Sequence, residues 1–174
     1  RSIGNRDGTG TEPEGDNLRY TINVAQGLAW TPIVDQRSIL GGQSAVDLAV
    51  SCISRAARPE EIGAIALAAW AAAETAGVFA KELFDLLEQH LRVGATVETV
   101  PCAWTLTAAL AGRHLGNTRE LQKLASDRLL DSQSVHGLFP HVTPLAKAGW
   151  GRSHVGCFAD QVYPIQALAR LAYL

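Results

Sequence analysis

Apolar side chains recur at helical spacing from Leu18 to the end of the chain, and no segment alternates apolar and polar residues over a strand's length. This pattern predicts seven helices, at residues 17–29, 44–57, 60–76, 79–92, 99–115, 118–132 and 160–173. Residues 1–16 are rich in Gly, Asp and Glu, with Ile3 as the one large aliphatic residue, which predicts a flexible arm or loop. We therefore expect an all-α protein, with a single helical-hairpin domain at residues 17–174.

The predicted helices differ in how far around the helix their apolar surface extends. The first, third, fifth and seventh are apolar or small around most of their circumference, as in a helix enclosed by its neighbours. The fourth and sixth keep a charged face beside an apolar stripe, and the second is intermediate. This alternation predicts paired inner and outer helices in two layers, joined by short turns.

Composition narrows the choice of partners. A chain of 174 residues with 47% hydrophobic side chains can bury one ordinary core. The net charge of -2 and the isoelectric point near 6.2 give no general attraction to nucleic acid or to an anionic membrane. The longest apolar run, residues 62–73, is shorter than a bilayer span. We therefore expect neither nucleic acid nor a membrane as a partner.

The sulfur-containing residues indicate a reducing setting. The three cysteines, Cys52, Cys102 and Cys157, lie far apart and form no CxxC pair, so we expect reduced, mostly buried thiols and favour a cytoplasmic location. The chain contains no Met and does not begin with one. This suggests a processed piece or a part of a larger polypeptide.

Paired inner and outer helices at this spacing, with polar loops ahead of the inner helices, resemble the α/α toroid of the six-hairpin glycosidase superfamily. The phrases "GLFPH" and "FADQVYPIQALARLA" are similar to segments of that superfamily. The resemblance implies a cleft at the N-terminal ends of the inner helices and a carbohydrate or other small polar substrate. This chain has about three and a half hairpins. Either further domains or chains complete the ring, or the chain is a shorter helical array.

Acidic residues stand at the start of every predicted inner helix. They are Asp16, Glu60 and Glu61, Glu98, and Asp160. Such acids often serve only to stabilise the helix N-terminus, through the helix dipole and free N–H groups. Glu98 and Asp160 also adjoin helices that carry Trp104 and Tyr163. Because glycoside hydrolysis needs two carboxyl groups facing one bond, we name Glu98 and Asp160 as the candidate catalytic pair.

The segment before the last helix gathers the remaining candidate residues. A sugar epimerase would use histidines as acid and base, with Arg152 holding an anionic or hydroxylated substrate. The candidate substrate-binding residues are His136, Phe139, His141, Arg152, His154, Trp104 and Tyr163. His154 and Cys157 are spaced as HxxC, but no CxxC or HExxH accompanies them, so we assign no metal site and no cofactor.

Two classes of function remain open. The leading hypothesis is a carbohydrate-active enzyme, either a glycoside hydrolase or a sugar epimerase, and the alternative is a non-catalytic α-helical scaffold or binding module. Terpene-cyclase chemistry is disfavoured because the sequence contains neither DxDD nor DDxxD.

Overall fold

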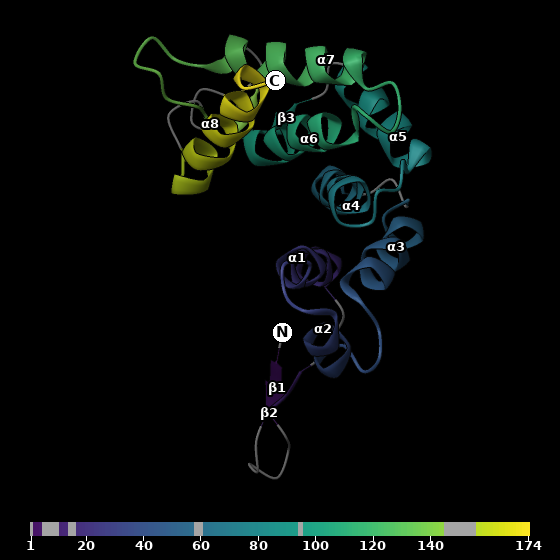
Figure 1. The fold of residues 1–174 in the computed structure, drawn as a ribbon. Helices are drawn as coiled ribbons and strands as arrows, with labels where there is room; N and C mark the ends of the chain where they lie inside the picture. The colour runs from purple at the N-terminus through teal and green to yellow at the C-terminus, as the bar shows by residue number, and fades with distance from the viewer. Residues whose placement is uncertain (1, 5–10, 14–16, 58–60, 94–95, 145–155) are drawn as a thin grey trace.

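The computed structural model describes residues 2–4, 11–13, 17–57, 61–93, 96–144 and 156–174, and for residues 2–4 and 11–13 it describes the backbone alone. Helices dominate these segments, which confirms the predicted all-α class (Figure 1). The eight helices of the described part are α1 (Leu18–Leu28), α2 (Ile33–Ile39), α3 (Ala45–Ala56), α4 (Ile62–Thr75), α5 (Lys81–Arg92), α6 (Thr99–Gly112), α7 (Arg119–Ser132) and α8 (Phe158–Ala172).

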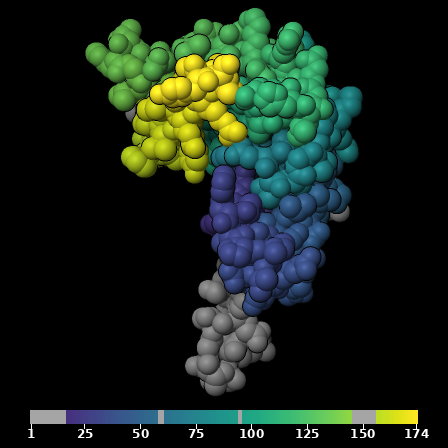
Figure 2. All heavy atoms as spheres, in the orientation of Figure 1, coloured from purple at the N-terminus to yellow at the C-terminus, as the bar shows by residue number. Residues whose placement is uncertain are grey.

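The helices form two layers. In the inner layer α1 packs on α4, α4 on α6, and α6 on α8, so that the four helices follow an arc (Figure 1). In the outer layer α3 packs on α1 and α4, α5 packs on α4, and α7 packs on α6. The space-filling view shows the same bend, with α8 overhanging the side toward which the arc opens (Figure 2). The paired arrangement agrees with the predicted inner and outer helices.

The centre of the inner layer is built from small side chains. Ten of the fourteen residues of α4 and eleven of the fourteen residues of α6 are buried, and alanine is frequent among them. Small side chains let two helix backbones approach closely, which explains the extensive packing of α4 on α6. These helices are enclosed, as the sequence predicts.

The helices at the two ends of the arc are not enclosed. Helix α1 buries only Ile22 and Ala25, and the side chain of Tyr20 is 70% exposed. Helix α8 leaves Ile165 and Phe158 exposed. The prediction that all four inner helices are enclosed is therefore wrong for α1 and α8, because each has an inner-layer neighbour on one side only.

Three short features also differ from the prediction. Helix α2 has seven residues, too few to show a helical period, and falls between the first two predicted helices. Within the predicted arm, β1 (Ser2–Gly4) pairs antiparallel with β2 (Thr11–Pro13). Strands β3 (Val97–Glu98) and β4 (Val142–Thr143) also pair antiparallel. Strands of two or three residues are too short to show an alternating pattern.

Two glycines, at the end of α6 and just after it, leave room for a pair of phenylalanine rings. The rings of Phe79 and Phe84 stack with their centroids 4.7 Å apart. A Cβ atom on Gly112 would lie 2.8 Å from Phe84, and one on Gly116 would lie 2.5 Å from Phe79. The stacked pair therefore occupies space that any larger residue at these two positions would fill.

Burial of the cysteines agrees in part with the sequence. Cys52 and Cys102 are buried, and burial raises the pKa of the Cys102 thiol to about 12. Cys157 is exposed, because it lies at the start of α8 rather than inside it. No helix among the described residues is long and apolar enough to cross a bilayer.

Candidate functional site

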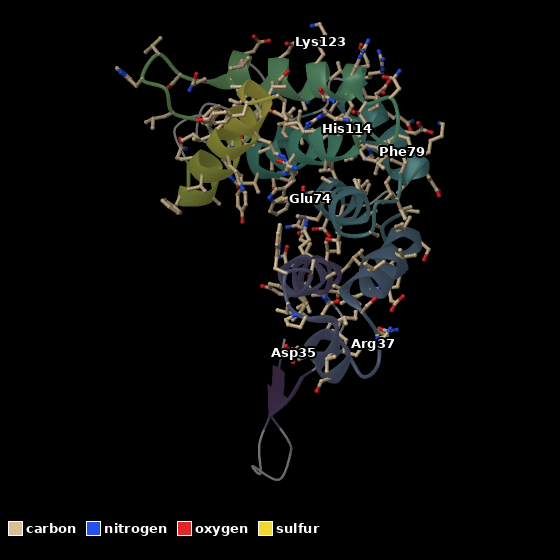
Figure 3. All side chains as sticks on the ribbon, viewed as in Figure 1. Asp35, Arg37, Glu74, Phe79, His114 and Lys123 are labelled. Carbon is tan, nitrogen blue, oxygen red and sulfur yellow. The ribbon has the colours of Figure 1, made fainter. Side chains whose placement is uncertain are left out.

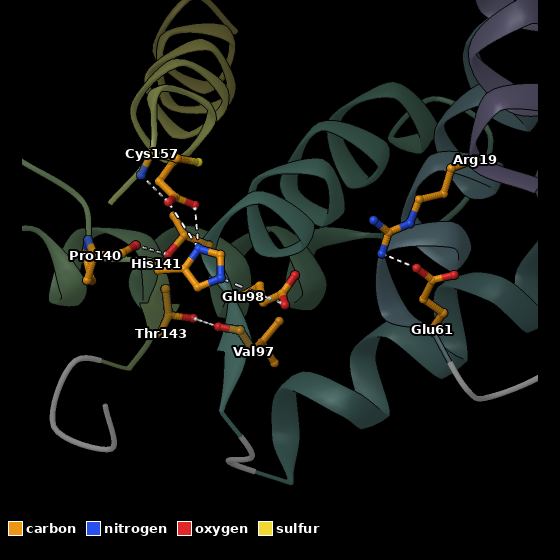
Figure 4. Close-up of polar contacts among 10 residues, drawn as sticks. Arg19, Glu61, Val97, Glu98, Pro140, His141, Thr143 and Cys157 are labelled. Carbon is orange, nitrogen blue, oxygen red and sulfur yellow. Dashed lines mark hydrogen bonds and ion pairs between the residues drawn. The ribbon is translucent and has the colours of Figure 1, made fainter. Parts of the chain in front are cut away.

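The chain segment that follows α7 crosses the start of α6. Strand β4 pairs there with β3, placing Val142 opposite Glu98. The Thr99 backbone N–H donates to the carbonyl oxygen of His141 over 2.9 Å, and the Thr99 hydroxyl donates to the carbonyl oxygen of Pro140 (Figure 4). Thr99 is fully buried, so these bonds are shielded from water. They fix the backbone of His141 against the first turn of α6.

The same segment is attached to α8. The Gln161 side-chain amide donates to the carbonyl oxygen of Phe139 over 2.8 Å, and its oxygen accepts from the Phe139 backbone N–H over 3.0 Å. The Phe139 ring is 3% exposed and belongs to the hydrophobic core. Phe139 thus anchors the segment, and its predicted role as a substrate contact does not fit this burial.

The imidazole of His141 lies between the two carboxylates predicted as the catalytic pair. Its Nδ1 is 3.1 Å from Oδ2 and 3.3 Å from Oδ1 of Asp160, and its Nε2 is 4.0 Å from Oε1 of Glu98 (Figure 4). An ionised carboxylate accepts hydrogen bonds and cannot donate them. When Asp160 is ionised, Nδ1 must therefore carry the proton, and in the neutral imidazole Nε2 keeps its lone pair.

The two carboxylates have different surroundings. Asp160 is buried, and its Oδ2 also accepts the backbone N–H of Cys157 over 2.7 Å, completing a capping box at the start of α8. Glu98 is the N-cap residue of α6, but its side chain forms no capping bond and is 57% exposed. Helix capping therefore explains the position of Asp160 and does not explain that of Glu98.

Aromatic and charged groups from all four inner helices meet near the starts of these helices. The Trp104 and Tyr163 rings make an edge-to-face contact, 5.3 Å between centroids. The Arg19 guanidinium lies 5.9 Å from the Trp104 ring centre and forms an ion pair with Glu61 (Figure 4). Since Arg19 lies in the first turn of α1 and Glu61 precedes α4, the N-terminal ends of the inner helices lie at one edge of the molecule.

Two nitrogen atoms in this group are buried without a hydrogen-bond partner among the described residues. They are Nε of Arg19 and the indole Nε1 of Trp104. A buried donor without an acceptor costs about 1–3 kcal/mol, so both are unusual features of a folded chain. Sequence reasoning did not single out Arg19, because nothing in its local pattern distinguishes it from other polar residues of α1.

The remaining predicted site residues are His136, Arg152 and His154. His136 is exposed in the turn that follows α7. Arg152 and His154 lie outside the described residues. Over the described segments, no cluster of three or more His, Cys, Asp or Glu side chains is arranged to hold a metal ion. Of the two histidines of the segment that the structure describes, His141 is the one that lies beside Glu98 and Asp160.

Comparison with protein-family models, with curated proteins and with solved structures finds no match for this chain.

Proposed function

We propose that this chain is a carbohydrate-active domain of the sugar-epimerase type, in which His141 carries out acid–base chemistry. The observation that carries the proposal is the Asp160–His141–Glu98 arrangement, with the imidazole held by a buried carboxylate at the edge where the inner helices begin. A group that transfers protons near neutral pH needs a fixed orientation and an accessible nitrogen. The Asp160 carboxylate supplies the orientation, and the 38% exposure of the His141 side chain supplies the access.

The proposed step is a proton transfer next to a carbonyl group. Nε2 of His141 removes the proton from the carbon adjacent to the aldehyde or ketone of an open-chain sugar. The electron pair of that C–H bond forms a C=C bond, and the π electrons of the carbonyl move to its oxygen, giving an enediolate. Return of a proton to the opposite face of the same carbon yields the epimer. Glu98, whose Oε1 is 4.0 Å from His141 Nε2, is placed to deliver or accept a proton beside the imidazole.

The same geometry supports an epimerase over a glycoside hydrolase. In a hydrolase the two carboxyl groups face one glycosidic bond with only water or the bond between them. Here the imidazole ring stands between Glu98 and Asp160, and the Asp160 carboxylate is already occupied by His141 and Cys157. Asp160 is therefore proposed as a positioning residue for His141. Glu98 and His141 are the residues proposed to meet the substrate.

The aromatic pair favours a sugar as the substrate. Trp104 and Tyr163 are each partly buried, so parts of both side chains remain accessible beside the starts of α6 and α8. Aromatic faces bind the apolar C–H face of a pyranose, and the Tyr hydroxyl can meet its hydroxyl groups. This combination suits a polar ligand with one apolar face.

Solvent deuterium exchange tests the proposal. The full chain is incubated in D₂O with a panel of reducing sugars, and mass spectrometry follows deuterium uptake at carbon. The wild type is expected to label at least one sugar, and His141→Gln to slow the labelling by about 10²–10⁴-fold, the usual contribution of a general base. His136→Gln, which alters an exposed histidine in the same segment, should label at the wild-type rate.

The exchange experiment also separates the competing functions. Release of new reducing ends from a glycan without deuterium uptake would replace the epimerase with a hydrolase. A well-folded chain that labels no sugar and hydrolyses no glycan would instead favour the non-catalytic scaffold. Equal labelling by wild type and His141→Gln would refute the role proposed for His141.

A further inference from the structure

A hollow lies at the opposite end of the inner helices from His141. It is lined by Gln26, Ala29, Trp30, Trp70, Glu74 and Thr75, and its volume is about 350 Å³. The hollow and the edge that carries His141 lie at opposite ends of α4, because Glu61 precedes the helix and Glu74 lies in its last turn. Fourteen residues at 1.5 Å each make that separation roughly 20 Å. The two regions are therefore distinct.

Trp30 is the most unusual residue of this hollow. Trp30 follows the end of α1 and is 88% exposed. A tryptophan side chain has a large apolar surface, which is usually buried. The partly buried Trp70 lines the same hollow from α4. Two indole groups beside one concavity provide flat apolar surface and a polar N–H edge.

The charge in the hollow is compensated. Oε2 of Glu74 accepts from Nε1 of Trp70 and from the guanidinium of Arg170, each over 2.7 Å. Figure 3 shows Glu74 on the inner side of the arc, beside α4, and Arg170 reaches it from α8. The ion pair neutralises the carboxylate, so the site favours an uncharged ligand over a cation or an anion. A carboxylate has acceptor positions for more than two donors and can still bind hydroxyl groups.

We propose that this hollow is a binding site for a neutral saccharide, with Trp30 as the stacking platform. A pyranose has an apolar C–H face that matches an indole ring, and hydroxyl groups that match Gln26, Glu74 and Thr75. The volume stands at the lower end of the roughly 300–1,000 Å³ typical of ligand sites, which suits a mono- or disaccharide. The site does not depend on proton transfer at His141, since it shares none of the residues proposed for that reaction.

Indole N–H signals in ¹⁵N-labelled full-length chain report on this site directly. Each signal is assigned by a Trp→Phe substitution, and glucose, mannose, galactose, cellobiose and maltose are titrated separately. At least one saccharide is expected to shift the Trp30 and Trp70 signals along one saturable curve. Trp30→Ala should weaken the affinity read from Trp70 by about tenfold or more, as expected for loss of an aromatic anchor. Tyr20→Ala removes an exposed ring from α1, the helix that precedes Trp30, and should leave the affinity unchanged.

Three outcomes would overturn the saccharide site. They are the absence of any shift at Trp30 and Trp70 with every sugar, an unchanged affinity in Trp30→Ala, and a response to choline or glucuronate in place of neutral sugars. The His141→Gln variant separates this proposal from the proposed function, because it should slow deuterium labelling and leave the Trp30 and Trp70 shifts intact. Shifts confined to Trp104 would place saccharide binding beside His141 and count against the second site.

Discussion

Asp160 acts on two elements at once. Its carboxylate accepts the Cys157 backbone N–H, which stabilises the start of α8, and it faces Nδ1 of His141, which belongs to the segment after α7. Sequence analysis identified Asp160 from its place ahead of an inner helix, and capping alone would have accounted for that place. The contact with His141 could not be predicted, because the two residues are nineteen positions apart and meet only through tertiary structure.

Substitution of Asp160 by asparagine tests this double role. Asn keeps the size of the side chain but loses the charge, and its amide nitrogen is a donor where two donors already point. We expect the free energy of unfolding of Asp160→Asn to fall by about 1–3 kcal/mol, the usual cost of leaving buried hydrogen-bonding groups unsatisfied. Urea unfolding followed by circular dichroism measures the change.

Asp131→Asn provides the matched control, because Asp131 is exposed near the end of α7. Its free energy of unfolding should stay within about 0.5 kcal/mol of the wild type. Equal effects at the two positions would show that the buried carboxylate contributes no more to stability than an exposed one.

At the scale of elements, the sequence predicted best where helices are long. The long apolar runs of α4 and α6 identify the enclosed helices, since only a helix surrounded by neighbours tolerates apolar residues on every side. Helix α2 was not predicted, because seven residues span barely two turns. The pairing of β3 with β4 was not predicted either, since Val97 and Thr143 are far apart in sequence and each strand has two residues.

The contact of the Phe84 ring with Gly112 leads to a prediction about this glycine. Alanine at Gly112 would place its Cβ 2.8 Å from the buried Phe84 ring, which is itself stacked on Phe79 and cannot move freely. We expect Gly112→Ala to lower the free energy of unfolding by about 1–3 kcal/mol through overpacking, despite the better helix propensity of alanine.

Gly27→Ala is the control within α1. No atom lies within 4 Å of a Cβ built at Gly27, so the substitution should stabilise the chain by about 0.5–1 kcal/mol. Thermal unfolding tests both expectations: the midpoint should fall in Gly112→Ala and rise in Gly27→Ala. A stabilised Gly112→Ala variant would contradict the close contact of the Phe84 ring with Gly112.

At the scale of the whole molecule, four inner helices run with their N-terminal ends at one edge. The alternation of enclosed and half-exposed helices predicts the two layers, and the acids ahead of inner helices point to this edge. The sequence does not reveal which segment crosses the edge. The segment after α7 is held there by hydrogen bonds of Thr99 to Pro140 and His141 and of Gln161 to Phe139. All of these bonds join distant parts of the chain.

The proposed function requires that Asp160 fixes the His141 imidazole with Nε2 available for proton transfer. Long-range ¹H–¹⁵N correlation spectra of the imidazoles, recorded in buffer alkaline enough to keep them neutral, identify the protonated ring nitrogen. His90 provides an internal reference, because its Nδ1 must donate to the carbonyl oxygen of Leu86, 2.8 Å away. We expect His141 to carry its proton on Nδ1, as His90 does, and to lose this preference in Asp160→Asn. A proton on Nε2 of His141 in the wild type would contradict this expectation.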